Sequence, residues 1–293
     1  MAVRAVICRG CDCRQKNNPA LSHTDFRGAG FIPCAFLFLP AVRLIRIIYR
    51  LIFFAVYTTR IVAEVYWRRV ILRSDMRRVM AVRRRWARHV LSGVGVCVET
   101  TGTPPEVPCL ILANHRSYLD PILLLRDVFA FPVAKAELAG WPLIGKGAQW
   151  AGILYVQRER GGSRVSTLKA LADVIQQQGF SVILFPEGTT SGVPGMLPFK
   201  KGSLRTATKW SLPVVPVAIC FNDPRDYWVG EASFLEHAWQ RFQDREIRVK
   251  VCYGPLLRHD DPEILETEVR QWIEAQLSAD ERHHSSNMSF PSL

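Results

Sequence analysis

Short apolar runs alternate with longer amphipathic stretches from Val94 onward. Val94, Val96 and Val98 are apolar at every second position, which is typical of a half-buried strand. Further apolar runs predict strands at 107–113, 131–135, 152–157, 180–185, 214–220 and 247–254. Between them, apolar residues at helical spacing predict helices at 118–125, 140–150, 164–178, 201–211 and 262–277.

This order of elements indicates the fold class. Short apolar strands that alternate with helices favour an α/β fold with a mostly parallel, mixed sheet and helices on both faces. We assign this domain to residues 91–278. Residues 1–30 mix charge, Gly, Pro and Cys without periodicity and predict a disordered leader. Residues 279–293 are polar, include His283 and His284, and predict a loose tail.

Residues 31–90 predict membrane-associating helices that are basic and amphipathic or hydrophobic. Arg43, Arg46 and Arg50 share one helical face, and the opposite face is apolar: Leu44, Ile47, Ile48, Leu51 and Phe54. This pattern indicates an interfacial helix with its guanidinium groups at headgroup depth. Between 31 and 72 no 18-residue window is free of charge, which argues against a plain spanning helix. A tilted or re-entrant pair of helices is the preferred interpretation. A single span and an amphipathic helix packed on the protein itself stay open.

The basic charge is concentrated in the first third of the chain. The net charge is +12, and residues 1–100 hold 18 Lys and Arg against 5 Asp and Glu. Nine arginines lie between 68 and 88 and are interleaved with apolar residues, which favours an anionic membrane surface over nucleic acid. A solvated basic helix face is the alternative.

The cysteines do not predict a disulfide framework. Cys97, Cys109, Cys220 and Cys252 lie in apolar, strand-like runs and are expected to be buried free thiols. Cys8, Cys11 and Cys13 have no matching later pair, so we expect no metal site. The pattern is typical of a protein facing a reducing cytosol.

Three polar stretches follow predicted strands, where ligands collect in open α/β sheets: NHRSYLD (114–120), QRER (157–160) and PEGTTS (186–191). On one continuous helix His115 and Asp120 would point about 140° apart, so a strand must end near Ala113 and a helix begin near Tyr118–Asp120. Asp120 can then hold the imidazole as a general base. Ser117 lies close by but has no nucleophile elbow around it, so the base would act on a substrate hydroxyl.

The other two stretches offer groups that bind anions and hydroxyls. Arg158 could bind a phosphate through two hydrogen bonds, and a salt bridge to Glu159 is the alternative. Glu187 suits an arginine partner or an acceptor hydroxyl, Gly188 allows close approach of the backbone, and Thr189 offers hydroxyl and N–H groups. Lys201 stands, with Lys200 and Arg205, around a helix start that also favours an anion.

Together these stretches resemble the glycerolipid acyltransferases typified by 1-acylglycerol-3-phosphate acyltransferase. NHRSYLD is similar to the N-H-x4-D block of that family, GILYVQR to the second block, FPEGTTS with PFKKG to the third, and VVPVAI around Pro216 to the fourth. AKAEL and WPLIG (134–145) also resemble a segment of that family. One departure is Thr190, where basic residues are common in the members that form phosphatidic acid.

The resemblance implies the following chemistry. His115, held by Asp120, deprotonates the free hydroxyl of a lysophospholipid, most simply 1-acylglycerol 3-phosphate, which attacks a thioester of acyl-CoA or acyl-carrier protein. Arg158, Glu187, Gly188 and Thr189 would hold the acceptor, with help from Lys201. No cofactor or metal is implied. The enzyme would be membrane-associated with its active site facing the cytoplasm, at the inner membrane in a bacterium.

Three alternatives stay open. The acceptor could be a lyso-ornithine-type lipid, another lysophospholipid or glycerol 3-phosphate. The protein could bind lipids at the membrane without turnover. The base could also activate water, which would make the protein a thioester hydrolase.

Overall fold

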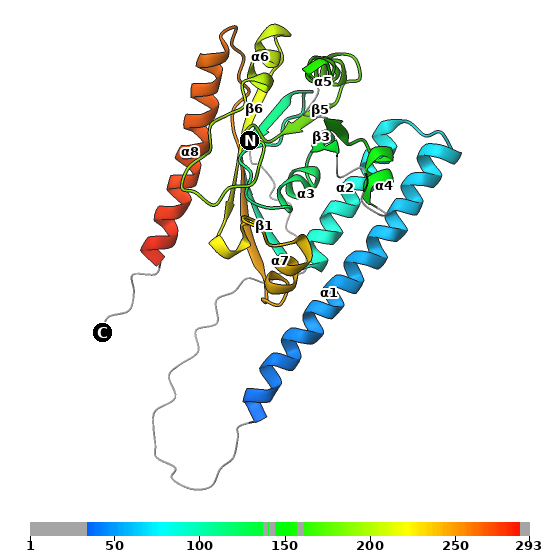
Figure 1. The fold of residues 1–293 in the computed structure, drawn as a ribbon, viewed down its shortest axis with the longest axis vertical. Helices are drawn as coiled ribbons and strands as arrows, with labels where there is room; N and C mark the ends of the chain where they lie inside the picture. Colours follow the sequence, from blue (N-terminus) through cyan, green and yellow to red (C-terminus); the bar gives the residue numbers. More distant parts are fainter. Residues whose placement is uncertain (1–33, 137–139, 141–143, 157–160, 288–293) are drawn as a thin grey trace, which may run out of the picture.

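A seven-stranded sheet lies at the centre of the computed structural model (Figure 1), which describes residues 34–136, 140, 144–156 and 161–287. Its strands run in the order β1-β7-β6-β2-β5-β3-β4, and every neighbouring pair is parallel except β6 and β7. The strands are β1 Val96–Thr101, β2 Leu110–Ala113, β3 Ala130–Lys135, β4 Leu154–Val156, β5 Ser181–Leu184, β6 Val214–Phe221 and β7 Ile247–Tyr253. The expected mostly parallel, mixed sheet is confirmed.

The register of the central strands sets the place of the site. Leu112 of β2 lies opposite Leu184 of β5, and Ala113 lies opposite Val217 of β6. Because β2 and β5 are parallel and end level with each other, the segments that follow them leave the sheet at the same edge. That edge receives the NHRSYLD and PEGTTS stretches.

Helices cover both faces of the sheet (Figure 1), because side chains of a strand point alternately to opposite sides. On one face of the sheet, Ile111 packs against three helices: α2 (Met76–Gly93), α3 (Asp120–Leu125) and α7 (Phe234–Arg241). Leu110 and Leu112 pack on the other face against α5 (Gly161–Gln176), α6 (Gly202–Lys209) and α8 (Pro262–Asn287). The short helix α4 (Ile144–Trp150) precedes β4.

The two ends of the chain depart from expectation or lie outside the description. Helix α8 continues past Ser278 to Asn287, so the prediction of a loose tail is wrong for 279–287. The leader 1–30, with Cys8, Cys11 and Cys13, and residues 288–293 lie outside the described residues. Cys109, Cys220 and Cys252 are buried free thiols as expected, and Cys97 is only partly buried.

Helix α7 was not predicted. It begins after Ser233, whose side chain accepts the N–H of Glu236, while the Glu236 carboxylate accepts the N–H of Ser233. This capping box is a signal that the sequence S-F-L-E contains. A short helix of eight residues gives too little periodicity for the pattern alone to reveal it.

The N-terminal helix α1 (Cys34–Tyr66) lies against the domain with its arginine side inward. Arg46 donates to the carbonyl of Gln243 at 2.7 Å, and Arg50, 6% exposed, donates to three carbonyls that follow α7. The predicted placement of these guanidinium groups at headgroup depth is therefore wrong. Arg46 and Arg50 therefore supply hydrogen-bond donors to backbone carbonyls in the segment that follows α7.

The opposite side of α1 is apolar and exposed. It carries Ile45, Tyr49, Ile52 and Val56, each more than half exposed. On the inward side, Ile47 has no exposed surface and belongs to the core, and the partly buried Leu51 and Phe54 pack against that core. The helix is thus packed on the protein along one side, while its apolar face stays uncovered.

Helix α2 follows α1 through a short π-helical turn, η1 (Trp67–Ile71), and many of its arginines are also used inside the fold. Arg83 is buried and donates to the carbonyls of Ala130, Ala151 and Gly152; burial lowers the pKa of its guanidinium to about 9. Arg84 and Arg88 donate to the carbonyl of Arg126, and Arg85 pairs with Glu64. Lipid contact is therefore wrong for the buried Arg83, and for the exposed Arg85 and Arg88 it stays a prediction.

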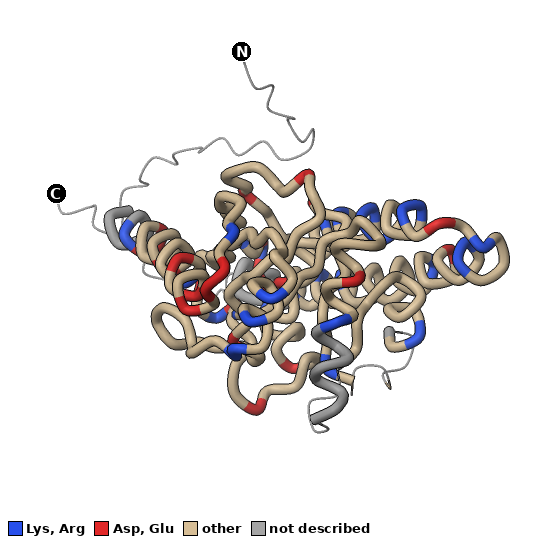
Figure 2. Tube along the Cα trace, turned by 90° about the horizontal axis from the view of Figure 1, so that it is seen from above, with Lys and Arg blue, Asp and Glu red and all other residues tan. Residues whose placement is uncertain are grey.

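Basic residues nevertheless gather on this side of the molecule. Figure 2 shows them along α1 and α2, opposite α8, which carries acidic residues. Arg43, Arg69 and Arg73 are exposed. Across the described helices, none has a stretch long and apolar enough to cross a bilayer.

Candidate active site

The turn between β2 and α3 carries the candidate base. We call residues 114–120 the His115 turn. The strand ends at Ala113 and the helix begins at Asp120, as the spacing of His115 and Asp120 required. The turn leaves the carboxyl end of β2, the edge at which ligands of open α/β sheets bind.

His115 and Asp120 form a hydrogen-bonded pair. The Nδ1 atom of His115 lies 2.8 Å from Oδ2 of Asp120, which is fully buried. The same oxygen accepts the backbone N–H groups of Arg116 at 2.6 Å and Ser117 at 2.8 Å. An oxygen that accepts these two N–H groups also accepts from the imidazole, so Nδ1 carries the proton and Nε2 is the basic nitrogen.

The ring of His115 is fixed in place and remains partly accessible to solvent. It stacks on Phe185, with 4.2 Å between ring centroids, and its side chain is 21% exposed. Within the described part of the chain, Nε2 has no hydrogen-bond partner. An oriented imidazole with a free, partly exposed nitrogen can take a proton from a bound hydroxyl.

Asn114 fixes the start of the turn. Its amide donates to the carbonyl of Ile219 at 2.9 Å and its oxygen accepts the N–H of Ile219 at 2.8 Å. The side chain is fully buried and joins the His115 turn to β6. The motif contains Asn114, but the sequence did not indicate this structural role.

Glu187 lies directly beside the His115 turn. Its Oε1 accepts the N–H of His115 and its Oε2 accepts the N–H of Leu197, both at 2.9 Å, and the residue is 3% exposed. Gly188 follows with a φ of +74°, a left-handed conformation that favours glycine. Glu187 therefore positions the backbone of His115, and its contact with an acceptor hydroxyl stays a prediction.

The loop from Pro186 to Lys200 is closed on itself and tied to the domain. The N–H of Lys200 donates to the carbonyl of Pro186 at 2.9 Å. Arg116, on the His115 turn, donates to the carbonyls of Ser191 at 2.6 Å and of Gly195. Arg270 of α8 donates to the carbonyl of Leu197 at 2.6 Å. Long-range donors thus order a loop that has no regular structure.

The other candidate residues occupy different positions. Thr189 is exposed on the 186–200 loop, and Lys201 is exposed at the N-cap of α6. Arg158 lies outside the described residues. Ser117 is fully buried and its Oγ accepts the N–H of Leu119 at 3.4 Å. The structure therefore brings His115, Asp120, Glu187 and Gly188 together, and the ligand contacts of Arg158, Thr189 and Lys201 stay predictions.

Comparison with known proteins finds matches to the part of the chain that carries this site. Residues 95–220 match a family model described as Acyltransferase. These residues include the His115 turn and the Pro186–Lys200 loop. The resemblance drawn from the sequence motifs is thereby confirmed for this part of the chain.

Individual relatives point the same way. The chain is 32% identical over 146 residues to human 1-acyl-sn-glycerol-3-phosphate acyltransferase alpha, covering 48% of this chain and 51% of that protein. It is 31% identical over 160 residues to a lyso-ornithine lipid O-acyltransferase from Pseudomonas aeruginosa, covering 53% of this chain and 61% of that protein. The chain thus spans about half the length of the human relative.

A solved structure shares the fold. The crystal structure of the 1-acyl-sn-glycerophosphate (LPA) acyltransferase PlsC from Thermotoga maritima aligns with a TM-score of 0.64. The alignment covers 87% of this chain and all of that chain at 20% identity.

Proposed function

We propose that this protein transfers an acyl group from a thioester to the free hydroxyl of a lysophospholipid, with 1-acylglycerol 3-phosphate as the acceptor and phosphatidic acid as the product. The observation that carries the proposal is the His115–Asp120 pair at the carboxyl end of β2, with Nδ1 held by a buried carboxylate. The acyltransferase family of residues 95–220 supports it.

The geometry supports direct transfer. Nε2 of His115 removes the proton of the acceptor hydroxyl as its oxygen attacks the thioester carbonyl. The tetrahedral intermediate then collapses, the carbon–sulfur bond breaks, and the departing thiolate takes the proton from the imidazolium. Asp120 stabilises the imidazolium that forms in between. Ser117 is buried and bonded within the turn, which argues against an acyl-enzyme.

The acceptor would lie along the edge formed by the PEGTTS stretch. In this proposal Arg158 binds the phosphate, Thr189 and the Gly188 backbone contact the glycerol, and Lys201 adds positive charge. Glu187 accepts a hydrogen bond from an acceptor hydroxyl, in addition to the two N–H groups it accepts already. The donor is acyl-CoA or acyl-carrier protein.

A second acceptor has specific support. Thr190 stands where basic residues are common in phosphatidic-acid-forming members, and a 31% identical relative is a lyso-ornithine lipid O-acyltransferase. A head group with fewer negative charges needs fewer cations beside the site. The same chemistry on a lyso-ornithine-type lipid is therefore the alternative.

The site would work at an anionic membrane surface on the cytoplasmic side. The support is the uncovered apolar face of α1 (Ile45, Tyr49, Ile52 and Val56) together with the exposed cations of α1 and α2. An amphipathic helix of this kind lies in the interface plane. The acceptor lipid lies in that same plane.

The test is lipid mass spectrometry with the purified full chain, acyl-CoA or acyl-carrier-protein donors, and a panel of lysolipids. We expect one acylated product, absent with His115→Ala and unchanged with His259→Gln. His259 is a matched control, because it also pairs with a carboxylate, Glu268, at 2.8 Å. Thioester consumption without any acceptor would indicate a hydrolase. Lysolipid binding with no product from any donor would overturn the proposed transfer.

A further inference from the structure

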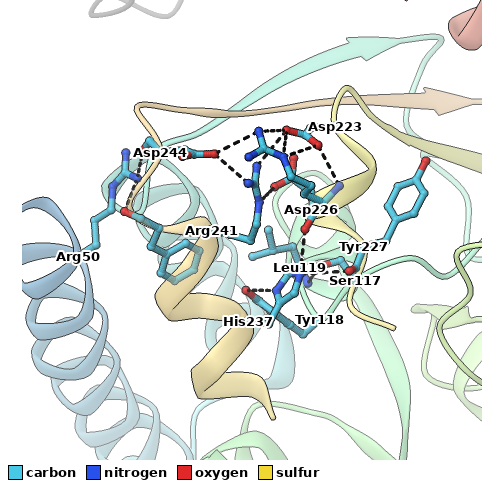
Figure 3. Close-up of polar contacts among 12 residues, drawn as sticks. Arg50, Ser117, Tyr118, Leu119, Asp223, Asp226, Tyr227, His237, Arg241 and Asp244 are labelled. Atoms are coloured by element: carbon cyan, nitrogen blue, oxygen red, sulfur yellow. Dashed lines mark hydrogen bonds and ion pairs between the residues drawn. The ribbon is translucent and has the colours of Figure 1, made fainter. Parts of the chain in front are cut away.

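A segment that follows β6 packs against the His115 turn, although it belongs to none of the sequence motifs described above. It comprises residues 222–245, with the short 3-10 helix η3 (Pro224–Asp226) and α7 (Phe234–Arg241), and we call it the 222–245 clamp. Figure 3 shows Tyr118 of the turn beside His237 of α7. None of the motifs that indicated acyl transfer includes a residue of this segment.

Tyr118 stands between His115 and Asp120 in the sequence, and its ring is enclosed by the clamp. Ring centroids lie 4.7 Å from Phe234, 5.5 Å from His237 and 5.7 Å from Trp228, all in edge-to-face geometry. The hydroxyl lies 3.2 Å from Nδ1 of His237. Packing alone would be satisfied by phenylalanine, so the hydroxyl has a separate role.

The contacts of His237 fix which partner donates. Its Nε2 lies 3.1 Å from the carbonyl oxygens of both Arg225 and Tyr227, and each of these oxygens can only accept. Nε2 therefore carries the proton and Nδ1 accepts from the Tyr118 hydroxyl. Burial lowers the pKa of His237, which favours the same neutral state. The bond is a directional link between two backbone segments.

A second contact of the clamp is with Arg116, two residues before Tyr118. The backbone N–H of Trp228 donates to the carbonyl of Arg116 at 2.8 Å, and the Arg116 guanidinium lies 5.3 Å from the centre of the Tyr227 ring. The N–H groups of Arg116 and Ser117 are the ones that hold Asp120. The clamp therefore contacts Arg116, whose carbonyl shares a peptide bond with the Ser117 N–H, and Tyr118, the residue that follows Ser117.

The clamp itself is fixed by buried charge (Figure 3). Arg241 is 5% exposed and pairs with Asp226 at 2.7 Å, Asp244 at 2.8 Å and Asp223 at 3.4 Å. Arg50 of α1 donates to carbonyls that follow the C-terminal end of α7, including that of Asp244 at 2.7 Å. A rigid α7 can impose a position on Tyr118, which a mobile loop could not.

We propose that Tyr118 and His237 are positioning residues for the His115–Asp120 pair. The Tyr118–His237 hydrogen bond holds the backbone of the His115 turn so that Asp120 keeps its two N–H donors and His115 keeps its aim. The inference rests on the acyl transfer proposed above, and it has one consequence that does not depend on turnover. Loss of the Tyr118 hydroxyl must loosen the amide groups of Arg116 and Ser117.

The experiment uses Tyr118→Phe, which retains the ring packing and removes only the hydroxyl, and His237→Gln, which retains a donor for the two carbonyls. Steady-state kinetics and hydrogen exchange of the 115–120 amides are measured on the full chain. A misplaced base lowers turnover, so we expect kcat to fall roughly tenfold to a hundredfold in each variant with KM nearly unchanged. The double variant should lose no more than the worse single variant. His259→Gln is the matched control.

The outcomes separate this inference from the proposed function. Faster exchange at the 115–120 amides in Tyr118→Phe, with a lower kcat, supports it. Wild-type kinetics and wild-type exchange in Tyr118→Phe overturn it while leaving acyl transfer intact. A fall in kcat that matches a general loss of thermal stability, with exchange accelerated throughout the domain, also overturns it. If the wild-type chain has no acyltransferase activity, the proposed function is refuted. The comparison of hydrogen exchange between wild type and Tyr118→Phe then tests by itself whether Tyr118 positions the His115 turn.

Discussion

Arg50 offers a quantitative test of how α1 is attached. Its side chain donates to the carbonyls of Phe242 at 2.9 Å, Asp244 at 2.7 Å and Arg245 at 2.8 Å. Arg50→Met keeps much of the apolar stem and removes all three bonds. Burial, followed by the charge of Arg46, lowers the pKa of the guanidinium, so its desolvation already costs part of what the bonds contribute.

The magnitude follows from the surroundings of the three carbonyls. The contact with Phe242 is buried, so its oxygen loses a partner that water cannot replace, at about 1–3 kcal/mol. The other two contacts are only part-buried, and each oxygen regains water at a net cost of about 0.5–1 kcal/mol. With some of the desolvation cost recovered, the free energy of unfolding should fall by about 2–4 kcal/mol.

The assay is urea unfolding in mild detergent, followed by tryptophan fluorescence, with the loss read from the midpoint at unchanged slope. Arg43→Met is the matched control, because Arg43 lies exposed on the same helix, and it should change stability by less than about 0.5 kcal/mol. If the two variants unfold at the same urea concentration, the guanidinium of Arg50 does not hold α1 to α7 and the reasoning fails.

Three further predictions concern the site and its supports. Asp120→Asn should lower kcat by about 10³–10⁴-fold, since the imidazole tautomer is no longer fixed, while lysolipid binding measured by calorimetry is retained. Asn114→Ala removes two buried hydrogen bonds to Ile219. The free energy of unfolding, measured in urea, should fall by about 2–4 kcal/mol while the slope of the transition stays unchanged. Burial lowers the pKa of His237 in the folded chain. Below about pH 6.5 the unfolded chain therefore binds a proton at this residue that the folded chain does not bind, and the free energy of unfolding decreases as the pH falls. The difference in unfolding free energy between wild type and His237→Gln should therefore shrink between about pH 7.5 and 5.5, and a constant difference would contradict it.

The strands could be predicted because each is a short, nearly continuous apolar run. Strands of a parallel sheet covered on both faces bury both sets of side chains, as every residue of β6 does. Helix α1 was harder for a physical reason. An amphipathic pattern shows that a helix has two different faces, but it does not show which face meets the protein. Arg46 and Arg50 turned inward because the segment that follows α7, a helix that was not predicted, presents carbonyls to them.

The candidate site divides in the same way. The spacing of His115 and Asp120 admits one local geometry, so their contact could be predicted from the sequence. Glu187 instead contacts the backbone N–H of His115, 72 positions away, and a backbone donor leaves no trace in residue identity. The same holds for His237, whose partner Tyr118 is 119 positions away. Such contacts depend on how strands pair, which only the structure shows.

The pairing of β1 with β7 has a consequence for how the chain is made. At the edge of the described sheet, β1 has β7 as its neighbour, with Val96 opposite Ile247 and Thr101 opposite Cys252. During synthesis α1 and α2 leave the ribosome long before Tyr253 does. For that interval β1 has no strand beside it, so the membrane contact proposed above has time to form before the sheet is complete.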